Sequence, residues 1–204
     1  MHDLDELDLE SLERRIDIAS QEECLISIIN TTPAILELIK RKVGDSYKGL
    51  HVVRDPRNVL VSAYFHHLDG HPVDHRNFYW PLLGKIRKEL KQMSMVEGMM
   101  RELETITGKV LSQHFTCLPG TSDIQTMKLE DASLGDRGWL CDIAKHLDIE
   151  FSSDAALSIG DTQPNTTVDS PRDWKLFFND EIKQVFKARY SRLLVDFGYE
   201  ACED

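Results

Sequence analysis

One short apolar run that ends at an Asp-Pro pair limits the folds open to this chain more than any other segment. Residues 50–53 form a β-type run, and Pro56 stands where the first residue of a helix would, with Asp55 as its N-cap. Arg54 is therefore predicted at the carboxyl end of a strand. Ser62 follows about two helical turns later and could return to the side of Arg54. A guanidinium and a hydroxyl that converge at such a crevice suit a phosphate.

Short apolar strands alternate with amphipathic helices along the rest of the chain, which favours an α/β fold with a parallel sheet flanked by helices. A strand at 24–29, a helix at 33–43 and the strand at 50–53 form a βαβ unit, whose carboxyl edge is where such sheets bind ligands. We also expect helices at 4–16, 81–92, 94–116, 136–148 and 180–197, a strand at 124–129, and loops at 69–80 and 152–171.

The composition predicts a single domain that spans residues 1–204, in which residues 1–20 form an acidic, peripheral N-terminal helix. The net charge of −11 opposes nonspecific binding to nucleic acid or to an anionic membrane. No apolar run is long enough to span a bilayer and the first residues lack the features of a signal peptide, so we expect a cytoplasmic protein. The four scattered cysteines favour reduced, mostly structural thiols.

The run from Arg54 through Asp-Pro-Arg-Asn-Val-Leu-Val to Ser62, followed by Ala-Tyr, resembles the 3′-phosphate-binding segment of sulfotransferases. These enzymes use 3′-phosphoadenosine 5′-phosphosulfate (PAPS) as the sulfuryl donor. Residues 94–102 resemble a mid-chain helix of the family, and residues 124–131 resemble the strand that normally reads Tyr-Glu-Asp. Residues 173–178 and 194–200 resemble its Gly-Asp-Trp-Lys segment and last helix, so the resemblance covers roughly residues 25–200.

The resemblance implies a P-loop-NTPase-like sulfotransferase fold and transfer of a sulfuryl group from PAPS to a hydroxyl or amine of a small-molecule acceptor. It assigns Arg54 and Ser62 to the 3′-phosphate of PAPS, the co-substrate, and it implies that Trp174 packs near the nucleotide. A metal is not part of this chemistry. The histidines at 66, 67, 71 and 75 do not follow a known metal-binding pattern either.

The chain also departs from the family pattern. A glycine-rich 5′-phosphosulfate loop cannot precede residue 40, because the first lysine is Lys40 and the first glycine is Gly44. The chain thus begins after that element or has lost it. Leu129 stands where the family has the tyrosine of Tyr-Glu-Asp, and Thr-Val-Asp at 167–169 stands where it often has Arg-Lys-Gly.

The catalytic base is unassigned. The usual histidine position falls at residues 29–33, where neither Asn30 nor Thr32 can act as a base near neutral pH. The nearest candidates are His66, His67 and Asp69.

Two alternatives stay open. The first is a non-catalytic nucleotide- or partner-binding protein with the sulfotransferase fold, or a fragment whose glycine-rich strand comes from elsewhere. The second is an α/β phosphate-binding protein that is unrelated to sulfuryl transfer. The acceptor and the oligomeric state are not predicted.

Overall fold

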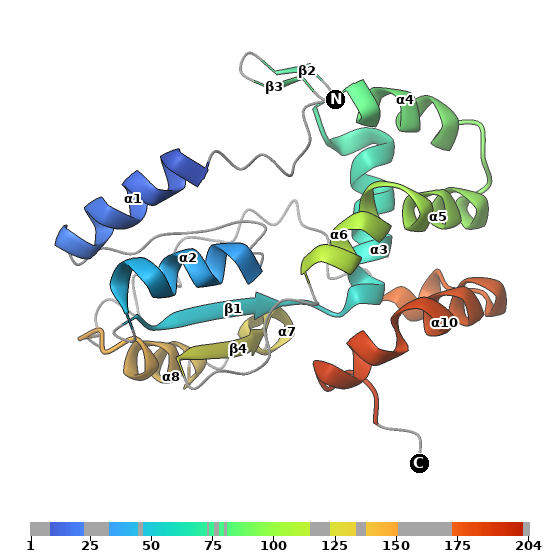
Figure 1. Ribbon diagram of the computed structural model, residues 1–204. Helices are drawn as coiled ribbons and strands as arrows, with labels where there is room; N and C mark the ends of the chain where they lie inside the picture. The colour runs from blue at the N-terminus through green and yellow to red at the C-terminus, as the bar shows by residue number, and fades with distance from the viewer. Residues whose placement is uncertain are drawn as a thin grey trace. The chain divides into compact units, whose positions relative to one another are not determined.

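The structure is a computed structural model of the chain, and its elements form a mostly helical α/β fold with a two-stranded parallel sheet (Figure 1). It describes residues 9–22, 33–44, 47–72, 74–75, 78–79, 81–114, 123–133, 138–150 and 173–201. The chain divides into two compact units, residues 1–51 with 113–126 and residues 52–112 with 127–204. The α/β class is confirmed, whereas the prediction of a single domain stays a prediction.

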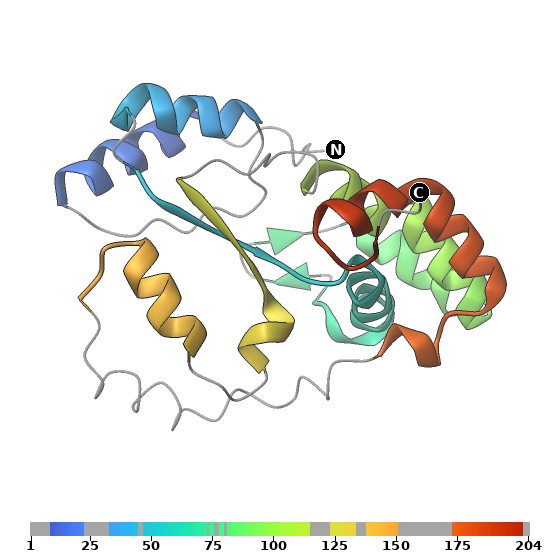
Figure 2. The same ribbon diagram turned by 90° about the horizontal axis from the view of Figure 1, so that it is seen from below.

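The first unit contains helices α1 (Leu9–Glu22) and α2 (Pro33–Val43), which lie side by side (Figures 1 and 2). Helix α2 has its predicted bounds, but α1 continues past the predicted end at residue 16, because no Gly or Pro interrupts residues 9–22. An apolar stripe on each helix packs against the other, and exposed ion pairs such as Arg41 to Glu13 at 2.7 Å border this contact. Its buried members are Leu12, Ile16, Ile35 and Leu38.

The sheet pairs β1 (Gly49–Val53) with β4 (Ile124–Lys128), which run in parallel (Figure 2). The backbone N–H of Gly49 donates to the carbonyl of Asp123 at 2.7 Å where the pairing begins. Both strands were predicted from their apolar runs and are confirmed. The predicted strand at 24–29 and the predicted loop at 152–171 lie outside the described residues.

In the second unit, α3 (Pro56–Phe65) begins as the sequence predicts. The Asp55 carboxylate accepts from the backbone N–H of Arg57 at 2.9 Å, and Pro56 occupies the first helical turn. The predicted loop at 69–80 is wrong in part. A π-helical turn, η1 (His66–Gly70), follows α3, and a short antiparallel hairpin of β2 (Asp74–His75) and β3 (Phe78–Tyr79) comes next.

Helix α4 (Pro81–Leu90) is confirmed, but the single helix predicted at 94–116 is wrong. The chain forms α5 (Met95–Glu104) and α6 (Ile106–His114), which are separated at Thr105. Thr105 has φ −126° and ψ −110°, outside the helical region. The chain turns so tightly here that a Cβ on Gly108 would lie 1.8 Å from the Leu103 carbonyl oxygen. Only glycine fits that position.

The remaining elements of this unit are α7 (Leu129–Ser133), α8 (Gly138–His146), the 3₁₀ turn η2 (Trp174–Leu176) and α10 (Asp180–Asp196). The helices predicted at 136–148 and 180–197 agree with α8 and α10 within two residues, which is the usual uncertainty of helix ends. Helices α3, α5 and α10 pack together (Figure 1). Their largest fully buried side chains include Leu60, Met99, Ile182, Phe186 and Leu194.

Within the described part of the chain, no helix has both the length and the apolar character needed to cross a membrane. Cys141, on α8, is an exposed free thiol, and the other three cysteines lie outside the described residues.

Candidate functional site

The first turn of α3 is organised by a buried guanidinium. Arg57 donates to both carboxylate oxygens of Asp55, with its Nε at 2.9 and 3.2 Å and a terminal nitrogen at 2.8 Å. Its other terminal nitrogen donates to Glu200 at 2.6 Å. Both Arg57 and Asp55 are buried, so this forked pair has little screening by solvent. The pair fixes the cap of α3 and attaches the end of the chain, after α10, to it.

The segment that contains η2 also contacts this turn. The backbone N–H of Trp174 donates to the Asn58 side-chain oxygen at 3.0 Å, and the Trp174 ring lies 4.2 Å from the Arg57 guanidinium carbon. Further along, the rings of Phe177 and Phe65 meet edge to face, with centroids 5.3 Å apart. Residues 174–177 therefore follow α3 from its first turn toward its last. Trp174 thus packs against the first turn of α3, and its place near a nucleotide stays a prediction.

The start of α7, directly after β4, supplies a third group at the same turn. Glu130 accepts from the backbone N–H of Asp55 at 2.9 Å and from the Tyr199 hydroxyl at 2.9 Å. Burial, followed by this hydrogen bond to Glu130, raises the pKa of Tyr199 above its usual value. Lys128 lies 4.6 Å from the centre of the Tyr199 ring and donates to the Gly198 carbonyl at 2.8 Å. These contacts hold residues 198–200 beside the strand end.

Arg54 and Ser62, the two predicted phosphate ligands, lie in the sequence just before and just after the first turn of α3. Arg54 follows directly after β1, Ser62 lies in the second turn of α3, and both residues are half-buried. Within the described part of the chain, neither side chain takes part in a hydrogen bond or ion pair. The Arg54 guanidinium and the Ser62 hydroxyl thus bond neither to each other nor to the groups around Arg57. Their joint action on one phosphate stays a prediction.

The start of α3 offers few amide donors. Glu130 binds the N–H of Asp55, Pro56 has no N–H, and Asp55 binds the N–H of Arg57. An anion at this edge would therefore rely on side chains. Arg54 is the cation next to the cap that lacks an ion pair within the described residues.

One face of α3 carries polar groups at helical spacing. Asn58 and Ser62 are four residues apart, and His66 follows four residues later, where the π-helical turn begins. All three residues are half-buried or exposed, whereas Leu60 on the other side of the helix is fully buried. Ser62 lies between the Asn58–Trp174 contact and the Phe65–Phe177 contact, so η2 borders the face that carries the hydroxyl.

The three candidates for the base differ in their surroundings. His67 is buried, and its Nδ1 lies 3.0 Å from a carboxylate oxygen of Glu102, a fully buried side chain that also accepts from the Thr107 hydroxyl at 2.6 Å. Asp69 is exposed and lies 3.5 Å from the Lys91 ammonium. His66 is exposed. His67 is thus engaged in a buried polar pair.

Two histidines and an arginine lie near the His66 ring. Partial burial of the ring lowers its pKa, and the nearby His71, His67 and Arg87 lower it further, so its imidazole is neutral near pH 7. The rings of His66 and His71 meet edge to face with centroids 4.9 Å apart. Despite this clustering, no set of three His, Cys, Asp or Glu side chains within the described ranges is arranged to hold a metal ion.

Sequence reasoning missed the roles of Arg57 and Glu102. The Arg57 clamp joins residues 143 positions apart, and no local pattern marks such a contact. Glu102 could have been noticed in the sequence, because it is a carboxylate among the apolar positions of α5 that face the core, next to Met99 and Leu103.

Comparison of the chain with protein-family models, with curated proteins and with solved structures finds no match.

Proposed function

We propose that this chain is a sulfotransferase-type protein with a P-loop-NTPase-like α/β core that binds the 3′-phosphate of PAPS through Arg54 and Ser62. The bound donor would transfer its sulfuryl group to a hydroxyl or amine of a small-molecule acceptor. The product left on the protein is then adenosine 3′,5′-bisphosphate.

One observation carries this proposal: segments that resemble the sulfotransferase pattern, although far apart in sequence, meet at the first turn of α3. Trp174 binds Asn58, Glu130 binds the N–H of Asp55, and Glu200 binds Arg57. The mid-chain segment packs on the last turn of the same helix through α5, where a Cβ added to Gly98 would lie 2.4 Å from the Tyr64 ring. If the resemblance to sulfotransferases at these separate segments were accidental, there would be no reason for the segments to contact the same helix.

Sulfuryl transfer from PAPS needs no covalent bond between the donor and the protein. The bond between the sulfuryl sulfur and the bridging phosphate oxygen breaks, a bond from sulfur to the acceptor oxygen or nitrogen forms, and the acceptor proton goes to a general base. The guanidinium of Arg54 would fix the leaving nucleotide through its 3′-phosphate, and the Ser62 hydroxyl would donate a second hydrogen bond. Both groups have this capacity because they make no other polar contact with described residues.

His66 is the candidate base that this arrangement favours. It lies four residues beyond Ser62, at the start of η1, is exposed, and has a lowered pKa that leaves it unprotonated at neutral pH. His67 is less suited, because its ring is buried against Glu102. Asp69 is less suited because the Lys91 ammonium lies 3.5 Å from its carboxylate and competes for it.

Calorimetric titration tests the nucleotide site, with two ligands that differ only at the 3′-position. Adenosine 3′,5′-bisphosphate should bind more tightly than adenosine 5′-monophosphate. Arg54→Ala should remove about tenfold or more of the affinity for the bisphosphate and little of the affinity for the monophosphate. Arg192→Ala is the matched control, because this exposed arginine pairs with Asp196 on α10. Equal affinities of the wild-type protein for the two ligands would end the proposal.

Transfer is tested separately from binding. Labelled PAPS is incubated with a panel of phenols, alcohols and amines, and sulfated product is measured for the wild-type protein and for His66→Gln. The proposal predicts product that falls about a hundredfold or more in the variant. If bisphosphate binding depends on Arg54 but no acceptor is sulfated, the non-catalytic nucleotide-binding alternative takes the place of the enzyme.

A further inference from the structure

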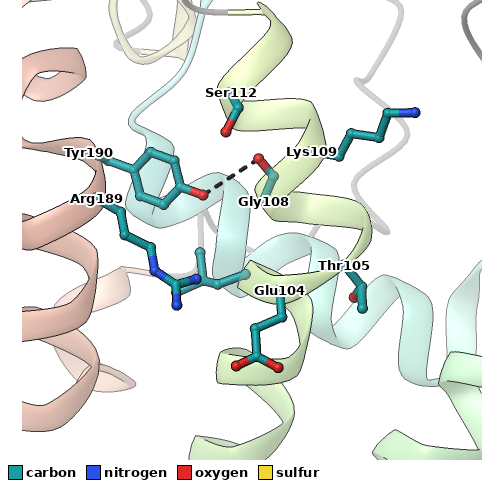
Figure 3. A pocket seen from close by; sticks show the side chains of 8 residues that line it. Glu104, Thr105, Gly108, Lys109, Ser112, Arg189 and Tyr190 are labelled. Carbon is teal, nitrogen blue, oxygen red and sulfur yellow. Dashed lines mark hydrogen bonds between the residues drawn. The ribbon is translucent and has the colours of Figure 1, made fainter.

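A hollow lies in the second unit, where the α5–α6 turn faces α10 (Figure 3). Its volume is about 540 Å³, within the range of small-molecule sites in proteins. Arg54 and Ser62 do not line it. Its lining residues are Leu103, Glu104, Thr105, Gly108, Lys109, Ser112, Arg189 and Tyr190.

The floor of this hollow is apolar and fixed by packing. Leu103 and Tyr190 are buried, and Gly108 is held against the Leu103 carbonyl by the break between the two helices. The Tyr190 hydroxyl points to the Gly108 carbonyl across 3.5 Å (Figure 3). A hydrogen bond of that length is weak. The hydroxyl thus keeps most of its capacity to bind a polar group of a ligand.

The rim carries charge of both signs, but only part of it is neutralised by neighbours. Glu104 lies 3.8 Å from Arg101, one turn earlier on α5. Arg189 extends from α10 toward the α5–α6 turn and takes part in no ion pair or hydrogen bond with a described residue (Figure 3). Lys109 also lines the hollow but has contacts of its own. The Arg189 guanidinium is therefore the group at this rim that is available to an anion.

From these features we propose that the hollow binds a small organic acid with an apolar body. The apolar part would lie on Leu103 and the Tyr190 ring, and a carboxylate or sulfonate would pair with the Arg189 guanidinium. The size of the hollow and its apolar floor suit a ring or a short chain. The charge of Arg189 suits an acid group at one end of such a ligand. This site is independent of the proposed nucleotide site.

Chemical-shift mapping with three probes tests the site on the full chain. The probes are 2-naphthoate, 2-naphthalenesulfonate and the uncharged 2-naphthol, which share one ring system. Both anions should shift the amide signals of Gly108, Ser112 and Tyr190, with dissociation constants of about 1 mM or below, ordinary for ligands of this size. The neutral probe should bind at least about tenfold more weakly.

Variants separate the charge from the cavity. Arg189→Gln should weaken binding of both anions about tenfold or more, and the matched control Arg192→Gln on the same helix should not. Ser112→Trp should fill the hollow and abolish binding while it leaves Arg189 in place. The proposal is overturned if 2-naphthol binds as well as the anions, if Arg189→Gln binds like the wild type, or if the shifted amides lie elsewhere in the chain.

Discussion

The Trp174 backbone N–H donates to the Asn58 side-chain oxygen at 3.0 Å, and this hydrogen bond joins segments 116 residues apart. It brings the Asp-Trp-Lys segment to the helix that follows the Arg-Asp-Pro segment. The site around α3 is thus a product of long-range contacts, while the helix itself is specified locally by Asp55 and Pro56.

Removal of the Asn58 acceptor should detach this segment. Asn58→Ala leaves the partly buried N–H of Trp174 without a partner, so we expect a loss of about 1–3 kcal/mol in the free energy of unfolding. Hydrogen exchange at the Trp174 amide should become faster. Asn58→Asp keeps an acceptor oxygen and serves as the matched variant. Unchanged exchange in Asn58→Ala would show that the contact does not hold the segment.

The two arginines near the cap should respond differently to substitution. Arg57→Ala leaves the buried Asp55 carboxylate without its ionic partner and also removes the bond to Glu200, so it should cost about 3–5 kcal/mol in urea unfolding. Arg54→Ala should change stability by no more than about 0.5 kcal/mol, because Arg54 has no polar partner within the described residues. A large loss of stability in Arg54→Ala would mean that Arg54 is structural.

Stability should fall on mild acidification because of His66. Its pKa is lowered in the folded protein, first by burial and then by the nearby His71, His67 and Arg87. The unfolded chain therefore binds the proton more readily. The contribution of His66 to stability is present above its unfolded pKa of about 6.5 and is lost as the pH falls through the lower folded pKa.

Urea unfolding between about pH 7.5 and pH 5 measures this effect. His66→Gln should show a weaker pH dependence than the wild type, and an NMR titration of the His66 ring should have its midpoint below 6.5. A midpoint above that value would reverse the sign and contradict the account. Replacement of the half-buried His146 on α8 is the control.

Gly108 should tolerate no side chain. A Cβ at this position would lie 1.8 Å from a backbone oxygen, that of Leu103, so the chain itself must shift. Gly108→Ala should therefore destabilise the protein by about 1–3 kcal/mol, despite the higher helix propensity of alanine. Thermal unfolding measures this loss. An increase in stability would show that the two helices can separate at Thr105 without cost.

The sequence predicted the elements whose signals are local. The apolar run of β1, the Asp-Pro start of α3 and the 3.6-residue periodicity of α2 and α10 are confirmed. The break at Thr105 was missed because the apolar spacing continues through both helices, although Gly108 marked the place.

For the site, sequence alone identified Arg54 and Ser62 by their spacing and Trp174 by resemblance, and the packing role of Trp174 agrees with the structure. The Arg57 clamp and the His67–Glu102 pair could not be predicted, because each depends on which distant carboxylate tertiary packing brings to the arginine or histidine. Phosphate binding by Arg54 and Ser62 stays a prediction.

A crystal structure of the protein with adenosine 3′,5′-bisphosphate tests the central claim most directly. We predict that oxygens of the 3′-phosphate lie about 2.7–3.2 Å from both the Arg54 guanidinium and the Ser62 hydroxyl. A nucleotide bound elsewhere, or side chains of residues 54 and 62 that face separate surroundings in the complex, would contradict it.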